Sequence, residues 1–198
     1  MKTKEIISIQ TLVTATMVAV LLTITSCGRQ GNSTKEKASS SVSQRNSKPP
    51  GIDIHTATLM GDLKSINQHI KAGSDLDEKD QYGSTPLIIA VTFGKTEVAG
   101  TLIGAGADIN CRNNEGSTPL HIAAFFCRTE IVKILLDNGA DKNLENNFGS
   151  TPLESVAGPF DNVKGIYDQF GKDLGPLGLK LDYEYIKATR PRIAEMLQ

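Results

Sequence analysis

The sequence predicts an all-α protein built as a solenoid of stacked helix hairpins, and two observations carry this prediction. First, the motif Gly-Ser-Thr-Pro-Leu begins at Gly83, Gly116 and Gly149, so that successive copies are 33 residues apart. Second, the match between the first two copies extends to the Gly-Ala-Asp segments at 106–108 and 139–141. A constant period of this length is typical of repeat proteins, in which each unit packs against its neighbours.

Each Thr-Pro pair predicts the start of a helix. The threonines at 85, 118 and 151 stand where an N-cap belongs, and proline at the first helical position gives up no hydrogen bond. Gly94 can end the first helix of its unit by adopting the left-handed conformation. Apolar residues at helical spacing then predict a second helix, ending at Gly106 or Gly139. The turn-rich segments 108–115 and 141–148 predict fingers that lead to the next unit.

These residues resemble the ankyrin repeat, whose pattern runs Thr-Pro-Leu-His-x-Ala, a glycine, a second apolar helix and Gly-Ala-Asp-x-Asn. The resemblance implies an ankyrin-repeat solenoid of about four to five repeats, including degenerate caps. The expected units are a degenerate first repeat at 51–82, repeats at 83–115 and 116–148, a divergent repeat at 149–180 and capping helices at 181–198.

The divergent C-terminal part has its own expected elements. Gly158-Pro159 should end one helix, and Asp161 should cap the next. Four Gly or Pro residues in 171–180 favour an irregular connection, and we expect a last pair of helices at 182–188 and 191–197.

Residues 1–26 have the composition of an export signal, with two lysines near the start and an apolar run strongest from Met17 to Leu22. The run ends in Ile-Thr-Ser-Cys27, which resembles the bacterial lipoprotein signal. The resemblance implies cleavage before Cys27, acylation of Cys27 and a place in the bacterial cell envelope. Because Gly28 rather than Asp follows, an outer-membrane anchor facing the periplasm is favoured in a Gram-negative host. An uncleaved transmembrane helix is the alternative, disfavoured by the Ser, Thr and Gln residues of the run.

The segment 27–50 is expected to consist of the acylated cysteine and a disordered tether, because residues 28–50 are rich in Ser, Gln, Asn and Lys and contain almost no large apolar side chains. A flexible coil of this length typically reaches roughly 25–30 Å. The folded part could therefore stand off from a membrane.

Composition argues against several classes of function. The net charge is −1 and the sequence contains no basic stripe, so no nucleic-acid partner is expected. No nucleophile and base, nucleotide-binding loop or metal-ligand spacing can be recognised, so we predict no enzyme, cofactor, metal or small-molecule substrate. Asp75, Asp77 and Asp80 fail as a calcium loop because Lys79 takes a ligand position. His121 stands in the histidine slot of the family motif, which implies a structural hydrogen-bonding role.

Two cysteines remain after Cys27. Cys111 belongs to a finger, whereas Cys127 follows the helix at 119–126, which alone rises ~12 Å. Bridged Cα atoms lie within about 7 Å of each other. Both thiols should therefore be free.

The resemblance also implies a concave protein-binding face, formed by the finger tips and the exposed end of the first helices. Aromatic anchors within a polar rim are typical of protein interfaces. The predicted contact residues are Tyr82, Phe93, Arg112, Asn114, Glu115, Ser117, Phe125, Phe126, Asn147 and Phe148.

Alternatives stay open at this stage. Three of the aromatic residues, Phe93, Phe125 and Phe126, could instead pack against adjacent fingers. The partner could be an enzyme or toxin that the chain inhibits, as an immunity protein does. The chain could also be a structural spacer that stabilises an envelope enzyme without recognising a specific face.

Overall fold

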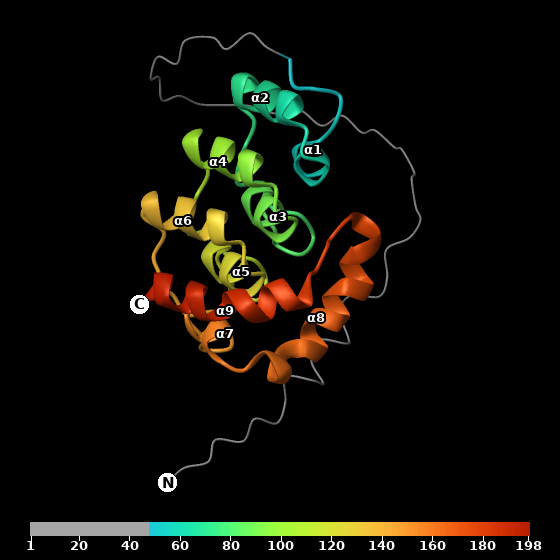
Figure 1. Cartoon of the computed structure of the whole chain (residues 1–198). Coiled ribbons are helices and arrows are strands. Elements are labelled where there is room, and N and C mark those ends of the chain that lie inside the picture. The colour runs from blue at the N-terminus through green and yellow to red at the C-terminus, as the bar shows by residue number, and fades with distance from the viewer. Residues whose placement is uncertain (1–47) are drawn as a thin grey trace. The chain divides into compact units, whose positions relative to one another are not determined.

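The computed structural model describes residues 48–198, and within this range the regular elements are helices (Figure 1). The predicted export signal, Cys27 and nearly all of the predicted tether lie outside the described residues. The predicted fold class, an all-α solenoid of stacked helix pairs, is confirmed.

The first three repeats are helix hairpins. Their first helices are α1 (Ile54–Met60), α3 (Pro86–Thr92) and α5 (Pro119–Phe125), and their second helices are α2 (Leu63–Ala72), α4 (Thr96–Gly104) and α6 (Thr129–Asp137). First helices pack on first helices and second helices on second helices, so two rows of helices run side by side (Figure 1). The apolar residues between the rows, such as Leu87, Leu102, Leu120 and Leu135, are fully buried.

Local sequence explains where these helices begin and end. The hydroxyls of Thr85 and Thr118 accept hydrogen bonds from the backbone N–H three residues on, and Asp53 replaces threonine at the start of α1. Gly61 and Gly94 follow the first helices with φ of 75° and 65°. In the third repeat Cys127 takes this position with φ of 52°, which is unusual for a residue with a Cβ.

The last repeat is built differently from the others. Its first helix is short, α7 (Glu154–Ala157), and Gly158 ends it as expected. The place of its second helix is taken by α9 (Tyr183–Leu197), which packs on α7, α5 and α6. Between them the chain inserts α8 (Phe160–Leu174) and a short 3-10 helix, η1 (Gly175–Leu177).

Three expectations for this region differ from the structure. Asp161 does not cap the next helix but lies in the first turn of α8, whose N-cap is Pro159. The irregular connection expected at 171–180 is in part the end of α8, and the expected pair of helices at 182–188 and 191–197 is the single helix α9. Pro191 removes one backbone donor but does not end α9, because one buried stripe runs through it on both sides. The stripe consists of Ile186, Arg190, Ile193 and Leu197.

Candidate protein-binding surface

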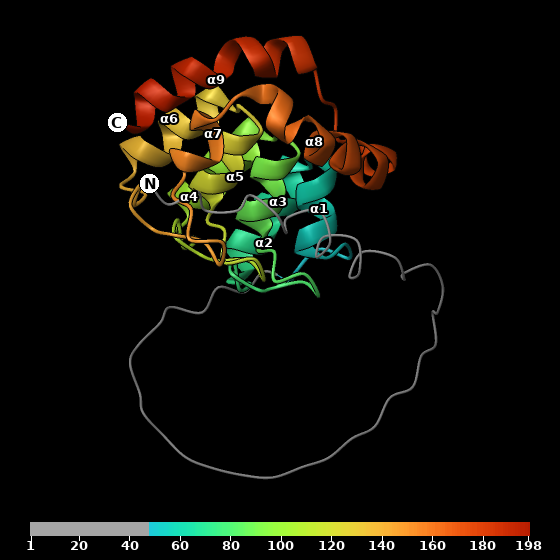
Figure 2. The ribbon, with the colours of Figure 1, turned by 90° about the horizontal axis from the view of Figure 1, so that it is seen from below.

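Three fingers, at 74–83, 107–116 and 140–149, extend together from one side of the helices, and α9 lies on the opposite side (Figure 2). Side chains join each finger to the next at the same register. The Asn114 amide donates to the carbonyl of Gln81 (3.3 Å), and the Asn147 amide donates to the carbonyl of Asn114 (3.0 Å). The backbone N–H of Asn147 also donates to the carbonyl of Glu115 at 3.0 Å. The fingers therefore form one hydrogen-bonded row.

The close approach of neighbouring fingers requires glycine at two points. Gly83 and Gly116 both have φ of 71°, and a Cβ on either would lie 2.4 Å from the side-chain oxygen of Asn114 or Asn147. The motif glycines are thus needed for conformation and for space.

Each finger turn is held by an Asp or Asn side chain. The Asp80 carboxylate accepts from the backbone N–H of Tyr82 and Ser84, both at 2.8 Å. The equivalent Asn146 accepts from Phe148 and Ser150 at 3.0 and 3.1 Å. These local bonds fix the residues at the tips, because they satisfy donors that would otherwise be free.

The tips carry the exposed aromatic side chains of the row. Tyr82 is 39% exposed and Phe148 is 56% exposed, and the exposed Glu115 occupies the equivalent position between them. Asn114 and Asn147 are also exposed. We call these five residues, Tyr82, Asn114, Glu115, Asn147 and Phe148, the fingertip surface.

Two other predicted contact residues have structural partners. The guanidinium of Arg112 donates to the carbonyls of Glu145 (2.7 Å) and Gly116 (3.2 Å), so it also ties one finger to the next. Ser117 is buried, and its hydroxyl lies 3.5 Å from the Asn146 amide.

The three remaining aromatic residues are not placed on an open face, which corrects the predicted exposure of this group. Phe126 is 2% exposed, and Phe93 and Phe125 are partly buried against the core. For Phe125 and Phe126 the reason is the inserted helix α8, whose Tyr167 stacks on Phe125 with ring centroids 4.4 Å apart. Phe170 of the same helix meets Phe126 edge to face at 5.3 Å. Helix α8 therefore covers the aromatic end of α5.

A buried polar chain fixes α8 in this place. The Tyr167 hydroxyl donates to the carbonyl of Phe125 and accepts from the Arg190 guanidinium at 3.0 Å. Arg190 also donates to the carbonyl of Gly158 at 2.9 Å, although it is only 4% exposed. Burial raises the pKa of Tyr167, which keeps its hydroxyl protonated. The sequence places Tyr167 on an apolar helical face, but nothing in it indicates that Tyr167 meets Arg190.

The histidines have structural contacts. The Nδ1 of His121 accepts from the backbone N–H of Thr118 (3.2 Å), so its Nε2 donates to the carbonyl of Ser150 (2.8 Å). Burial lowers the pKa of His121 and favours this neutral form. His69 bridges the carbonyl of Ile52 and the hydroxyl of Ser74, at 2.9 and 3.0 Å.

Neither cysteine of the described residues forms a disulfide. Cys111 and Cys127 are free and buried, and burial raises the pKa of each thiol to about 11. Within residues 48–198 no three His, Cys, Asp or Glu side chains are grouped so that they could hold a metal ion.

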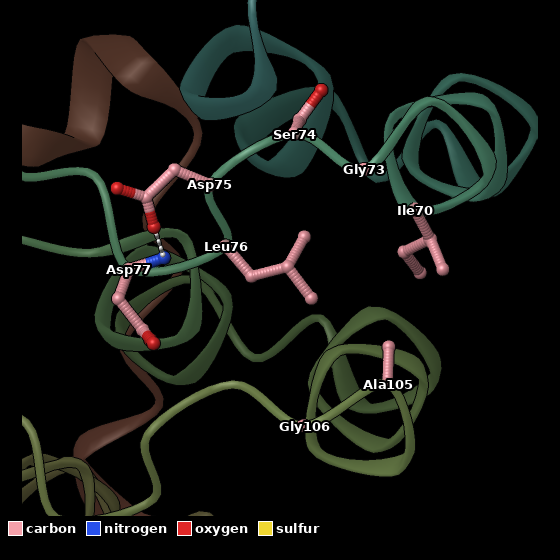
Figure 3. Close-up of a pocket in the computed structure, with 8 residues that line it drawn as sticks. All are labelled: Ile70, Gly73, Ser74, Asp75, Leu76, Asp77, Ala105 and Gly106. Carbon is pink, nitrogen blue, oxygen red and sulfur yellow. Dashed lines mark hydrogen bonds between the residues drawn. The ribbon is translucent and has the colours of Figure 1, made fainter. Parts of the chain in front are cut away.

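A hollow of about 310 Å³ lies between the end of α2 and the residues that follow α4 (Figure 3). Ile70 and Leu76 point into it, whereas the Asp75 carboxylate turns to the backbone N–H of Asp77 at 2.9 Å. Asp77 in turn accepts from the backbone N–H of Asp108 at 2.8 Å. Both carboxylates are therefore occupied by hydrogen bonds to the backbone of the fingers. The hollow is a gap between two successive repeats.

Stacked hairpins with one row of projecting fingers define a repeat solenoid whose surface suits macromolecular binding. The chain belongs to the ankyrin-repeat family: the family model for ankyrin repeats, in three copies, matches residues 54–164, more than half of the chain. Proteins of this family act as protein-interaction modules.

Curated relatives match over a shorter stretch. A human protein, protein phosphatase 1 regulatory subunit 27, is 38% identical over 56 residues, which are 28% of this chain and 36% of that protein. The mouse protein of the same name matches to the same extent. The chain therefore spans little more than a third of the length of these relatives. Among residues 48–198, none of the helices combines the length and apolarity that crossing a bilayer requires.

Proposed function

We propose that this chain is a non-catalytic interaction module that binds another protein through the fingertip surface. The observation that carries the proposal is the pair of exposed aromatic side chains, Tyr82 and Phe148, at equivalent positions of the first and third fingers. Family membership and the regulatory-subunit relative both favour a protein without catalysis.

The geometry favours binding of the partner at the finger tips over binding at the ends of the first helices, which were predicted to form part of a concave face. Aromatic anchors contribute most of the binding energy at interfaces when they are desolvated by a partner. Here the anchors stand on fingers already ordered by hydrogen bonds, so little conformational entropy would be lost on binding. Phe125 and Phe126 are covered by α8 and are therefore not offered to a partner.

The experiment is site-specific photo-cross-linking in cells. A photoreactive phenylalanine analogue is placed at position 82 or 148, and in matched controls at position 177 or 185. Leu177 and Tyr185 are similarly exposed, at 55% and 51%, but do not belong to the fingers. We expect one protein to be cross-linked from 82 and 148 and not from the controls. Equal cross-linking from all four positions would contradict the proposal and favour a spacer.

The identity of the cross-linked protein separates two roles. An enzyme or toxin whose activity falls on binding would favour the inhibitor alternative, to which the regulatory-subunit relative gives some weight. A protein without such activity would favour an adaptor role.

We further propose that the module is anchored to a bacterial envelope membrane by acylation of Cys27, on the basis of the lipoprotein-like segment that ends there. Two or more acyl chains hold a protein firmly on a membrane. Substituting Cys27→Ser should move the protein from the membrane fraction to the soluble fraction and abolish labelling by a fatty-acid analogue. Membrane retention of the variant without labelling would instead favour an uncleaved transmembrane helix.

A further inference from the structure

The excess negative charge of the described residues lies on the fingers. Residues 48–198 contain 20 Asp and Glu against 15 Lys and Arg, a net charge of −5. The three finger segments contain eight acidic residues and three basic ones, which gives the same value of −5. The helices and remaining loops therefore balance to zero.

This charge is not neutralised by ion pairs within the fold. In the part of the chain that the structure describes, the ion pairs are Lys133–Asp137 and Lys164–Asp168, both within helices. The one finger arginine, Arg112, donates to backbone carbonyls. The fingers that end in the exposed aromatic tips thus carry the uncompensated charge.

At two positions of the first finger, Asp77 and Asp80, the fold does not require a charged side chain. Asp77 accepts the backbone N–H of Asp108 (2.8 Å), and in the next finger Asn110 accepts that of Asp141 in the same way (2.9 Å). Asp80 likewise does in the first finger what Asn146 does in the third. Asparagine therefore makes the same bonds, so the negative charge of Asp77 and Asp80 is not needed for these turns.

We propose that the fingertip surface recognises a lysine- and arginine-rich segment of its partner protein. The argument rests on the proposed function and names the chemistry of the partner. Cationic side chains are attracted by the uncompensated carboxylates and can stack on the faces of Tyr82 and Phe148. An acidic or uncharged apolar segment would meet repulsion or leave the carboxylates desolvated.

The test measures binding of a labelled twelve-residue peptide of alternating Arg and Ala to the full-length chain in detergent, by fluorescence anisotropy. A second peptide replaces every Arg by Gln. The finger variant is Asp77→Asn, Glu78→Gln and Asp80→Asn, in which the two asparagines copy residues that the other fingers already use. The control variant is Glu130→Gln, Glu184→Gln and Glu195→Gln, three exposed helix residues, so both variants lose the same charge.

We expect the Arg peptide to bind and the Gln peptide not to bind at 50 mM salt. The finger variant should weaken binding about tenfold and the control variant less than about twofold, because charge complementarity acts at the contact. Binding should also weaken in 300 mM salt. Equal losses in the two variants, or no binding of the Arg peptide, would overturn the inference.

Failure of the basic-partner inference can be distinguished from failure of the proposed function. Specific cross-links from positions 82 and 148 together with no binding of the Arg peptide would leave the fingertip surface as the interface and reject a basic partner. Absence of both would reject the two proposals together.

Discussion

Replacing Tyr167 with alanine should lower the free energy of unfolding by about 3–5 kcal/mol, as expected for loss of a large buried aromatic side chain. Tyr167 is fully buried, and its ring stacks between Phe125 and Phe160 at centroid distances of 4.4 and 5.6 Å. The change removes this packing and the hydroxyl between Phe125 and Arg190. Urea unfolding followed by circular dichroism measures the effect.

Two further variants separate the contributions at this site. Tyr167→Phe keeps the ring but leaves buried polar groups of Phe125 and Arg190 without that partner, so it should cost about 1–3 kcal/mol. Tyr185→Ala removes a half-exposed ring from α9 and should change stability by about 0.5 kcal/mol or less. If Tyr167→Ala were as mild as Tyr185→Ala, α8 would not be packed on α5 in solution.

Replacing Gly116 with alanine should destabilise the protein by about 2 kcal/mol more than replacing Gly139. Both glycines have positive φ, 71° and 83°, so both substitutions carry the cost of a left-handed residue, about 1–2 kcal/mol. A Cβ on Gly139 meets no atom within 4 Å. At Gly116 it would lie 2.4 Å from the side-chain oxygen and 2.9 Å from the backbone nitrogen of Asn147, and such overpacking costs about 1–3 kcal/mol more.

The same pair of variants tests the contact between fingers. Both are compared by urea unfolding, and hydrogen exchange at the N–H of Asn147 reports its bond to the carbonyl of Glu115. We expect faster exchange there in Gly116→Ala than in Gly139→Ala. Equal stabilities and equal exchange would show that the second and third fingers are not held as closely as the structure describes.

The regular part of the fold could be predicted because its determinants are local. Thr85 and Thr118 cap helices through bonds to residues three positions on, and Gly94 closes a helix by its own backbone conformation. A period of 33 then places each new hairpin on the previous one. The fold class follows from such features without knowledge of long-range contacts.

The C-terminal part could not be predicted in the same way because its determinants are distant in sequence. Tyr167 meets Phe125 and Arg190, residues 42 and 23 positions away. The pattern of α8 predicts a helix with an apolar face, but it does not say that this face covers α5 while α9 completes the last repeat. Pro191 also favours a break that the packing of α9 overrides.

The candidate site was likewise predictable only in part. Tyr82, Asn114, Glu115, Asn147 and Phe148 fall on exposed finger positions, as the resemblance to ankyrin repeats implied. Phe125 and Phe126 are covered because the inserted helix α8 packs on them. The 33-residue period contains no information about such an insertion. That the fingertip surface binds a partner stays a prediction.

The most direct test of this prediction is the affinity of the cross-linked partner for three forms of the chain, measured by isothermal titration calorimetry. These are the unaltered protein, the Tyr82→Ala, Phe148→Ala variant and the Leu177→Ala, Tyr185→Ala control. We expect the fingertip variant to bind at least about 30-fold more weakly, since two aromatic anchors of about 1 kcal/mol or more each are lost, and the control to bind as the unaltered protein does. Unchanged affinity in the fingertip variant, with both variants folded, would contradict the account and place the interface elsewhere on the molecule.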